Sequence, residues 1–147
     1  MKQVLKAECR KTDKGLQVDC GARGFKLTLD EPEEMGSLNS GMNPLEAMLC
    51  ALGGCQAVVA TAFADAFGFK FEEFHLEIEG DWDPDGFMGA ADVRNGLTEI
   101  RVTPHFKTSE TVERCNEFAE FIESKCPVAD CLINGVNIVK NCAVVEK

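Results

Sequence analysis

The stretch that decides the fold is residues 44–67, PLEAMLCALGGCQAVVATAFADAF. It contains no lysine or arginine and has one acidic residue near each end. Asn43 is a good helix cap, Pro44 suits the first helical position, and Gly68 is a good helix end. At about 1.5 Å per residue, the stretch predicts a helix roughly 36 Å long.

A helix that is apolar on nearly every face is either the central helix of a globular core or a membrane span. This run is rich in alanine, includes Gln56 and Thr61, and lacks the basic flanks that anchor a membrane helix. We therefore expect a core helix and no membrane partner.

The sequence on either side of the helix predicts short strands and shorter helices. Turn signals divide it into short runs, several of which alternate polar and apolar residues as strands do. We expect three antiparallel strands, the long helix, a two-stranded hairpin, a helix capped by Ser109, a short helix and a last strand. The strands are predicted at 3–9, 16–20, 25–29, 75–80, 97–106 and 136–145, and the short helix at 127–133. This order is typical of a single α+β domain over residues 1–147.

The charge of the chain limits its partners. Among 147 residues, 15 Lys and Arg stand against 25 Asp and Glu, a formal net charge of -10. This surplus of negative charge disfavours phosphate backbones and anionic membranes, so nucleic acid is not expected as a partner. Eight cysteines would indicate a disulfide scaffold in a short secreted chain, but the N-terminus shows no basic and apolar leader. We expect a cytoplasmic protein in which most thiols are buried and inert.

Two cysteines are candidates for chemistry. Cys126 precedes Pro127 at a predicted helix start, where free backbone amides stabilise a thiolate. Cys55 lies within the apolar helix and stays protonated unless an Arg or Lys reaches it. Gly53 and Gly54 each cost roughly 1 kcal/mol relative to alanine in a helix, which indicates close approach of a substrate or another helix. We therefore expect thiol redox chemistry, with Cys126 as the more acidic thiol.

Metal binding does not fit the spacing of the cysteines. The chain has no CxxC motif and no paired spacing typical of a zinc site. His75 and His105 fall in or beside predicted strands, where a surface or hydrogen-bonded role is favoured over that of a catalytic base. We expect no metal and no cofactor.

The whole chain resembles the OsmC and Ohr family of thiol-dependent peroxidases. The matching segments are residues 30–33 (DEPE), 41–46 (GMNPLE), 51–55 (ALGGC) and 126–128 (CPV). The resemblance implies an OsmC-like fold, in which antiparallel strands wrap around long central helices in an intertwined homodimer. It also implies one active site at each end of the dimer interface.

Within this resemblance, Cys55 matches the peroxidatic cysteine and Cys126 the resolving cysteine. In the implied cycle, an organic hydroperoxide is converted to an alcohol and Cys55 is left as a sulfenic acid. Cys126 condenses with this sulfenic acid to form a disulfide. A dithiol reductant of the lipoyl type then restores both thiols. The family places an Arg beside the first thiol, for which Arg10 is preferred and Arg23 is the alternative. It also places a Glu at the helix start, which Glu46 matches one position later, about 100° further round the helix. Glu46 lies about 13 Å from Cys55 along the helix, so contact between them requires the partner subunit.

Two other functions fit the same features. The form Asn-Pro-Leu-Glu at residues 43–46 is closer to the OsmC-like branch, and a dimer of this kind can bind a small hydrophobic ligand without peroxidase activity. The glycines and the apolar helix then line the ligand pocket and the cysteines only pack. The third function is a stress-linked structural dimer whose thiols have ordinary acidity.

Overall fold

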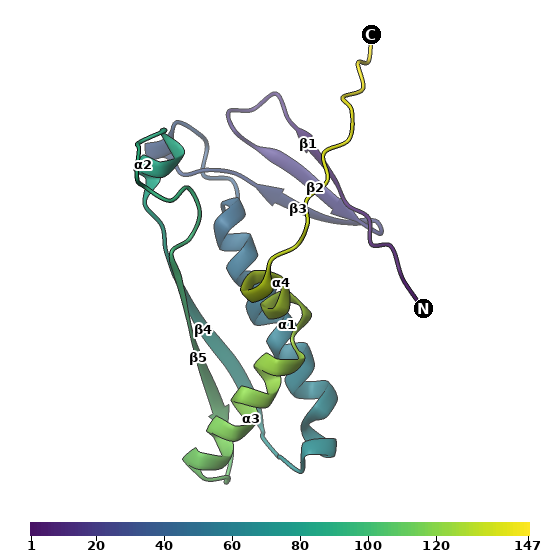
Figure 1. The fold of residues 1–147 in the computed structure, drawn as a ribbon, viewed down its shortest axis with the longest axis vertical. Coiled ribbons are helices and arrows are strands. Elements are labelled where there is room, and N and C mark those ends of the chain that lie inside the picture. Colours follow the sequence, from purple (N-terminus) through teal and green to yellow (C-terminus); the bar gives the residue numbers. More distant parts are fainter. The chain divides into compact units, whose positions relative to one another are not determined.

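A computed structural model describes residues 1–147 as two compact units, Met1–Ala51 and Leu52–Lys147 (Figure 1). The long helix α1, Pro44–Phe67, begins in the first unit and continues in the second. The other elements are β1 (Glu8–Lys11), β2 (Val18–Ala22), β3 (Phe25–Leu29), the 3-10 helix η1 (Glu33–Met35), β4 (Glu73–Asp81), α2 (Pro84–Phe87), β5 (Glu99–Lys107), α3 (Val112–Lys125) and α4 (Pro127–Asn134). The predicted α+β class is confirmed, and the prediction of a single domain stays a prediction.

The N-terminal unit carries an antiparallel sheet in the order β1-β2-β3. The predicted first strand is wrong at its start, because residues 1–7 form no strand. β2 starts two residues later than predicted, since the Thr12 amide donates to the Gln17 carbonyl at 3.1 Å and closes the turn there. Arg23 and Gly24, with φ of 53° and 87°, make the two-residue turn between β2 and β3.

The loop over residues 30–43 is organised by one buried carboxylate. Asp30 is 1% exposed and accepts hydrogen bonds from the hydroxyls of Ser37 and Ser40. It also accepts from the backbone amides of Glu31 and Ser40, at 2.8 and 3.0 Å. These bonds hold the loop that leads the chain into α1.

The C-terminal unit is built on the hairpin of β4 and β5, which flanks α1 in Figure 1. β4 alternates as predicted and β5 is the predicted returning strand, and their apolar positions pack against the buried core. On the polar face, Arg101 forms ion pairs with Glu79, Asp81 and Glu99. The hairpin is therefore amphipathic, with one face on the core.

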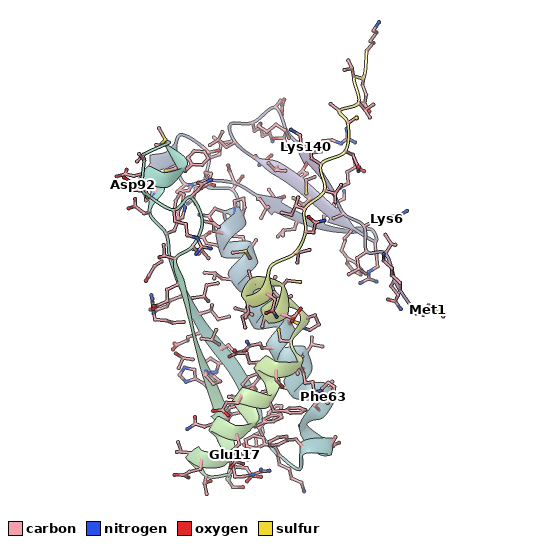
Figure 2. The ribbon with its side chains drawn as sticks, in the orientation of Figure 1. Met1, Lys6, Phe63, Asp92, Glu117 and Lys140 are labelled. Atoms are coloured by element: carbon pink, nitrogen blue, oxygen red, sulfur yellow. The ribbon has the colours of Figure 1, made fainter.

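The core joins α1 to α3 through aromatic and small side chains. Phe63 of α1, labelled in Figure 2, packs edge to face against Phe121 of α3, with ring centres 5.6 Å apart. Phe69 stacks on Phe118 at 4.5 Å. The buried cluster consists of Leu52, Val59, Ala60, Phe69, Phe118, Ile122, Cys126 and Ala129. The helix pattern predicted for α3 is confirmed, but its cap is Thr111, whose hydroxyl accepts from the Arg114 amide at 3.2 Å, and not Ser109.

The predicted last strand is wrong. Residues 136–145 form neither a helix nor a strand and are exposed throughout. Ile138 is 91% exposed and Val139 is 72% exposed. Their alternation is strand-like, but a strand must pair with a neighbouring strand, and within one chain this segment pairs with none.

One face of α1 is buried within a single chain. Gln56 and Ala60 are buried, whereas Val58 is 68% exposed and Phe63 is 37% exposed. By length and hydropathy α1 is capable of crossing a membrane, a test that core helices of soluble proteins also pass. Within one chain, α1 packs against the core with one face only. A cytoplasmic location remains a prediction, as does the absence of a membrane partner.

Replacing Asp30 with asparagine is expected to lower stability most at neutral pH. Hydrogen bonds from Ser37 and Ser40 hold the pKa of Asp30 well below its ordinary value. A carboxyl whose pKa is lowered by folding stabilises the protein at pH values above its pKa in the unfolded chain, which is about 4. This stabilisation is lost as the pH falls towards the pKa in the folded chain. Urea denaturation should therefore show a deficit for Asp30→Asn at pH 7 that shrinks between about pH 4 and pH 2. An equal deficit at both ends, or the same behaviour in the exposed control Asp13→Asn, would contradict this role.

Candidate functional site

Two cysteines distant in sequence meet in the C-terminal unit. Cys55 lies on α1, and Cys126 lies where α3 ends and α4 begins. Cys126 is 2% exposed and belongs to the buried cluster, whereas Cys55 is partly exposed and packs against that cluster. The packing of α3 and α4 on α1 therefore brings together one accessible thiol and one buried thiol.

Cys126 is the N-cap of α4, as the sequence predicts. Its Sγ accepts a hydrogen bond from the Ala129 amide at 3.3 Å, and Pro127 follows in the first turn. Its own amide donates to the Glu123 carbonyl at 3.1 Å and closes the last turn of α3. The residue is thus fixed by both helices.

The acidity predicted for Cys126 is wrong in direction. Burial raises the pKa of the Cys126 thiol, and this outweighs the lowering by the Ala129 amide. Contact with Cys55 raises the pKa of Cys126 further, because a thiolate at either sulfur disfavours a second one nearby. Cys126 is therefore a neutral thiol near pH 7.

The two glycines before Cys55 have different surroundings. A Cβ on Gly53 would lie 2.8 Å from Cδ1 of Ile78 on β4, so this glycine lets the strand pack close to α1. A Cβ on Gly54 would meet no atom within 4 Å. The close neighbour of Gly53 is thus a strand side chain and not another helix, and the space beside Gly54 is open.

Glu46 has a structural role at the start of α1. Its carboxylate accepts from the Asn43 amide, and its own amide donates to the Asn43 side chain, both at 2.8 Å. This reciprocal pair is a capping box, which the spacing of Asn43 and Glu46 signals in the sequence. Glu46 and Cys55 are nine positions apart on one helix, and a catalytic role for Glu46 stays a prediction.

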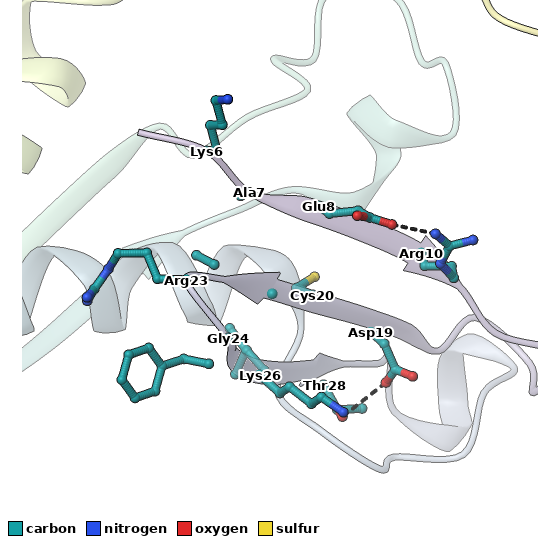
Figure 3. A pocket seen from close by; sticks show the side chains of 14 residues that line it. Lys6, Ala7, Glu8, Arg10, Asp19, Cys20, Arg23, Gly24, Lys26 and Thr28 are labelled. Atoms are coloured by element: carbon teal, nitrogen blue, oxygen red, sulfur yellow. Dashed lines mark hydrogen bonds and ion pairs between the residues drawn. The ribbon is translucent and has the colours of Figure 1, made fainter. Parts of the chain in front are cut away.

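The candidate cations belong to the N-terminal unit. Arg10 is exposed and pairs with Glu8 on the same strand. The Arg23 guanidinium lies 5.2 Å from the ring centre of Phe25. Both arginines line an open hollow of about 640 Å³, shown in Figure 3, and neither Cys55 nor the cap of α4 lines it. No Lys or Arg forms a hydrogen bond or ion pair with either thiol, so the activating roles of Arg10 and Arg23 stay predictions.

Two contacts in the region of the candidate site are absent from the sequence prediction. The Ala129 amide follows from the cap rule, because the third residue after an N-cap donates to its side chain. Ile78 has no such signal, because its contact with Gly53 depends on how the hairpin packs on α1.

Replacing Gly54 with alanine is expected to raise the free energy of unfolding by about 0.5–1 kcal/mol. The residue is helical and has space for a methyl group. The matched change Gly53→Ala should gain less, since its methyl group must displace the tip of Ile78. Urea denaturation of both variants checks the order. A Gly54→Ala variant less stable than the wild type would contradict it and would show that the space beside Cys55 is filled in the assembled protein.

Comparison with known proteins relates the chain to one family. The family model for OsmC-like protein matches residues 37–140. A hydroperoxide reductase of Mycoplasma genitalium is 28% identical over 121 residues, which are 82% of this chain and 81% of that protein.

Solved structures share the fold. An OsmC-like protein from Mycoplasma pneumoniae has a TM-score of 0.78 at 21% identity, over 99% of this chain and 100% of that one. The organic hydroperoxide resistance protein OsmC from Legionella pneumophila has a TM-score of 0.68 at 16% identity, over 93% and 94%. These matches confirm the predicted α+β fold, and the family model spans most of the sequence. The chain belongs to the OsmC-like protein family.

Proposed function

We propose that this protein is a thiol-dependent peroxidase that reduces organic hydroperoxides through Cys55 and Cys126. The observation that carries the proposal is the contact between a partly exposed thiol on α1 and a buried thiol at the α3–α4 junction. Membership of the OsmC-like family and a relative named hydroperoxide reductase support the substrate class.

The first step needs the more accessible thiol. The Cys55 thiolate attacks the hydroperoxide oxygen farther from the alkyl group, and the O–O bond breaks. The alkoxide leaves, takes a proton and becomes an alcohol, while Cys55 is oxidised by two electrons to a sulfenic acid. The open space beside Gly54 is where an alkyl group would approach the Cys55 sulfur.

The second step needs a neighbouring thiol that stays reduced until the first is oxidised. Cys126 meets this need because it is buried and neutral. Its sulfur attacks the Cys55 sulfenic sulfur, the thiol proton joins the departing hydroxide to form water, and a disulfide remains. The Ala129 amide, 3.3 Å from the Cys126 sulfur, stabilises negative charge on that sulfur during the attack.

The cycle closes by thiol–disulfide exchange. A dithiol reductant of the lipoyl type supplies two electrons and leaves as a cyclic disulfide, which returns both cysteines to thiols. A cation near Cys55 would favour its thiolate, and Arg10, or Arg23 as the alternative, is proposed for this role on the family pattern. Arg10 would then exchange its partner Glu8 for the thiolate.

A homodimer is proposed as the working form. On the exposed face of α1, Val58 is an apolar residue that is 68% exposed within one chain. Residues 136–145 likewise pair with no strand within one chain. A second copy would cover both, and the family pattern for Glu46 calls for a partner subunit at this helix.

The two thiols should give different products when each is removed. Cys55→Ser should lower turnover of cumene hydroperoxide by at least about 100-fold with dihydrolipoamide as reductant. Cys126→Ser should retain one rapid oxidation and leave a sulfenic acid on Cys55, detected as a dimedone adduct by mass spectrometry. The exposed Cys131→Ser control should turn over like the wild type.

If Cys55 and Cys126 both stay unmodified after treatment with cumene hydroperoxide, the proposed peroxidase activity is refuted. The small-ligand alternative instead predicts that hydrophobic ligand binding survives in the double variant Cys55→Ala and Cys126→Ala.

Charging the exposed face of α1 should disrupt the dimer. Light scattering is expected to give the wild type a mass near twice 16.1 kDa. Val58→Asp should shift the protein towards one copy, because a carboxylate buried at an apolar interface is costly. The matched change Val112→Asp, at an exposed apolar site on α3, should leave the dimer intact. A monomeric wild type would contradict the dimer.

A further inference from the structure

We propose that Cys9 and Cys20 form a second redox site, a dithiol on the N-terminal sheet that closes to a disulfide between β1 and β2. The site is separate from the thiol pair on α1 and α4, and none of its residues belongs to the four segments that carry the family resemblance. It goes beyond the proposed peroxidase and does not depend on it.

The register of the sheet sets the two thiols opposite each other. Cys9 pairs directly with Cys20 in the antiparallel ladder. The Thr12 amide donates to the Gln17 carbonyl at 3.1 Å, so Thr12 and Gln17 are a hydrogen-bonded pair. Hydrogen-bonded and non-hydrogen-bonded pairs alternate along such a ladder. Counting three pairs along the unbroken register makes Cys9 and Cys20 a non-hydrogen-bonded pair.

This type of pair has the spacing that a disulfide needs. Cα atoms of a non-hydrogen-bonded pair lie roughly 4.5 Å apart, and disulfides span roughly 4.4–6.8 Å between Cα atoms. Directly paired residues also project from the same face of the sheet. Closure therefore requires side-chain rotation with no change of register.

The two thiols already interact in the reduced protein. Contact with Cys9 raises the pKa of the Cys20 thiol, and partial burial adds to this effect. Cys9 is exposed and Cys20 is half-buried. Figure 3 shows Cys20 on β2 beside β1, among the residues that line the hollow. Cys9 is thus the thiol that an outside oxidant meets first, and Cys20 is the one that resolves it.

The oxidant class is a low-molecular-weight disulfide. The Cys9 thiolate attacks one sulfur of that disulfide, forms a mixed disulfide and releases one small thiol. The Cys20 thiolate then attacks the Cys9 sulfur and releases the second small thiol. Two protein thiols lose two electrons and two protons, and the small disulfide becomes two small thiols.

Closure links the first two strands covalently. The disulfide encloses the turn over residues 12–17 and ties β1 to its neighbour. Arg10 follows Cys9 directly, so closure also restrains the strand that carries the candidate cation. The oxidation state of this pair is therefore a means of regulating the N-terminal sheet.

Peptide mapping of the folded full-length protein tests the proposal. The protein is equilibrated with glutathione disulfide and glutathione, quenched with an alkylating agent and cut with trypsin. Cleavage after Arg10 and Lys14 places Cys9 in residues 7–10 and Cys20 in residues 15–23. We expect a disulfide to join these two peptides. On a denaturing, non-reducing gel, the undigested protein should run at the size of one chain, so the bond lies within a chain. The equilibrium constant for closing the Cys9–Cys20 disulfide with glutathione disulfide should be at least about tenfold higher in the native protein than in urea, because the sheet pre-aligns the thiols.

Two variants complete the test. In Cys20→Ser, the glutathione adduct on Cys9 should accumulate because nothing resolves it. In Cys55→Ser, the joined peptides should form as in the wild type, so a failed peroxidase does not affect this result. Alkylated Cys9 and Cys20 in the wild type, persistent separate glutathione adducts, or equal equilibrium constants in native protein and urea would each overturn the proposal.

Discussion

The packing of the α3–α4 junction on one face of α1 is the constraint on which the candidate site depends. Ala60 and Phe118 have no exposed surface, and Ile122 and Cys126 are nearly as buried. Phe63 and Phe67 of α1 pack against Phe118 and Phe121 of α3. Each buried Phe or Ile side chain contributes about 1.5–3 kcal/mol relative to exposure. This burial holds a residue from the end of α3 beside the third turn of α1.

The same packing determines the chemistry of the pair. A helix start by itself favours a thiolate, but the start of α4 is buried, and burial has the larger effect on the Cys126 thiol. Cys126 is therefore a buried, neutral thiol, and it lies next to the more accessible thiol of Cys55. In the proposed cycle, the Ala129 amide would stabilise the negative charge that develops on the Cys126 sulfur.

Local signals in the sequence predict α1 well. Pro44 and Gly68 delimit α1, and the alternation in β4 and β5 identifies the inner face of the hairpin. These features depend on neighbours within a few residues, so a sequence pattern contains them. The errors have non-local causes. Residues 136–145 alternate like a strand but pair with no strand in one chain, and the burial of Cys126 depends on residues about seventy positions away.

The candidate site was predictable to the extent that its residues have local signatures. The cap position of Cys126 follows from Pro127, and the meeting of Cys126 with Cys55 follows only from tertiary packing. The electrostatic partner of Cys55 has no local signature at all.

The central claim is that Cys55 and Cys126 of one subunit are redox partners. The most direct measurement is disulfide mapping of the wild type after one equivalent of cumene hydroperoxide. Trypsin places Cys55 in residues 27–70 together with Cys50, and Cys126 in residues 126–140 together with Cys131, so fragmentation of the joined peptides assigns the bond to Cys55 and Cys126. The account predicts that these two peptides are joined and that the undigested protein runs as a single chain on a denaturing, non-reducing gel. A disulfide that joins either cysteine to a different residue, with no link between these two peptides, would contradict it.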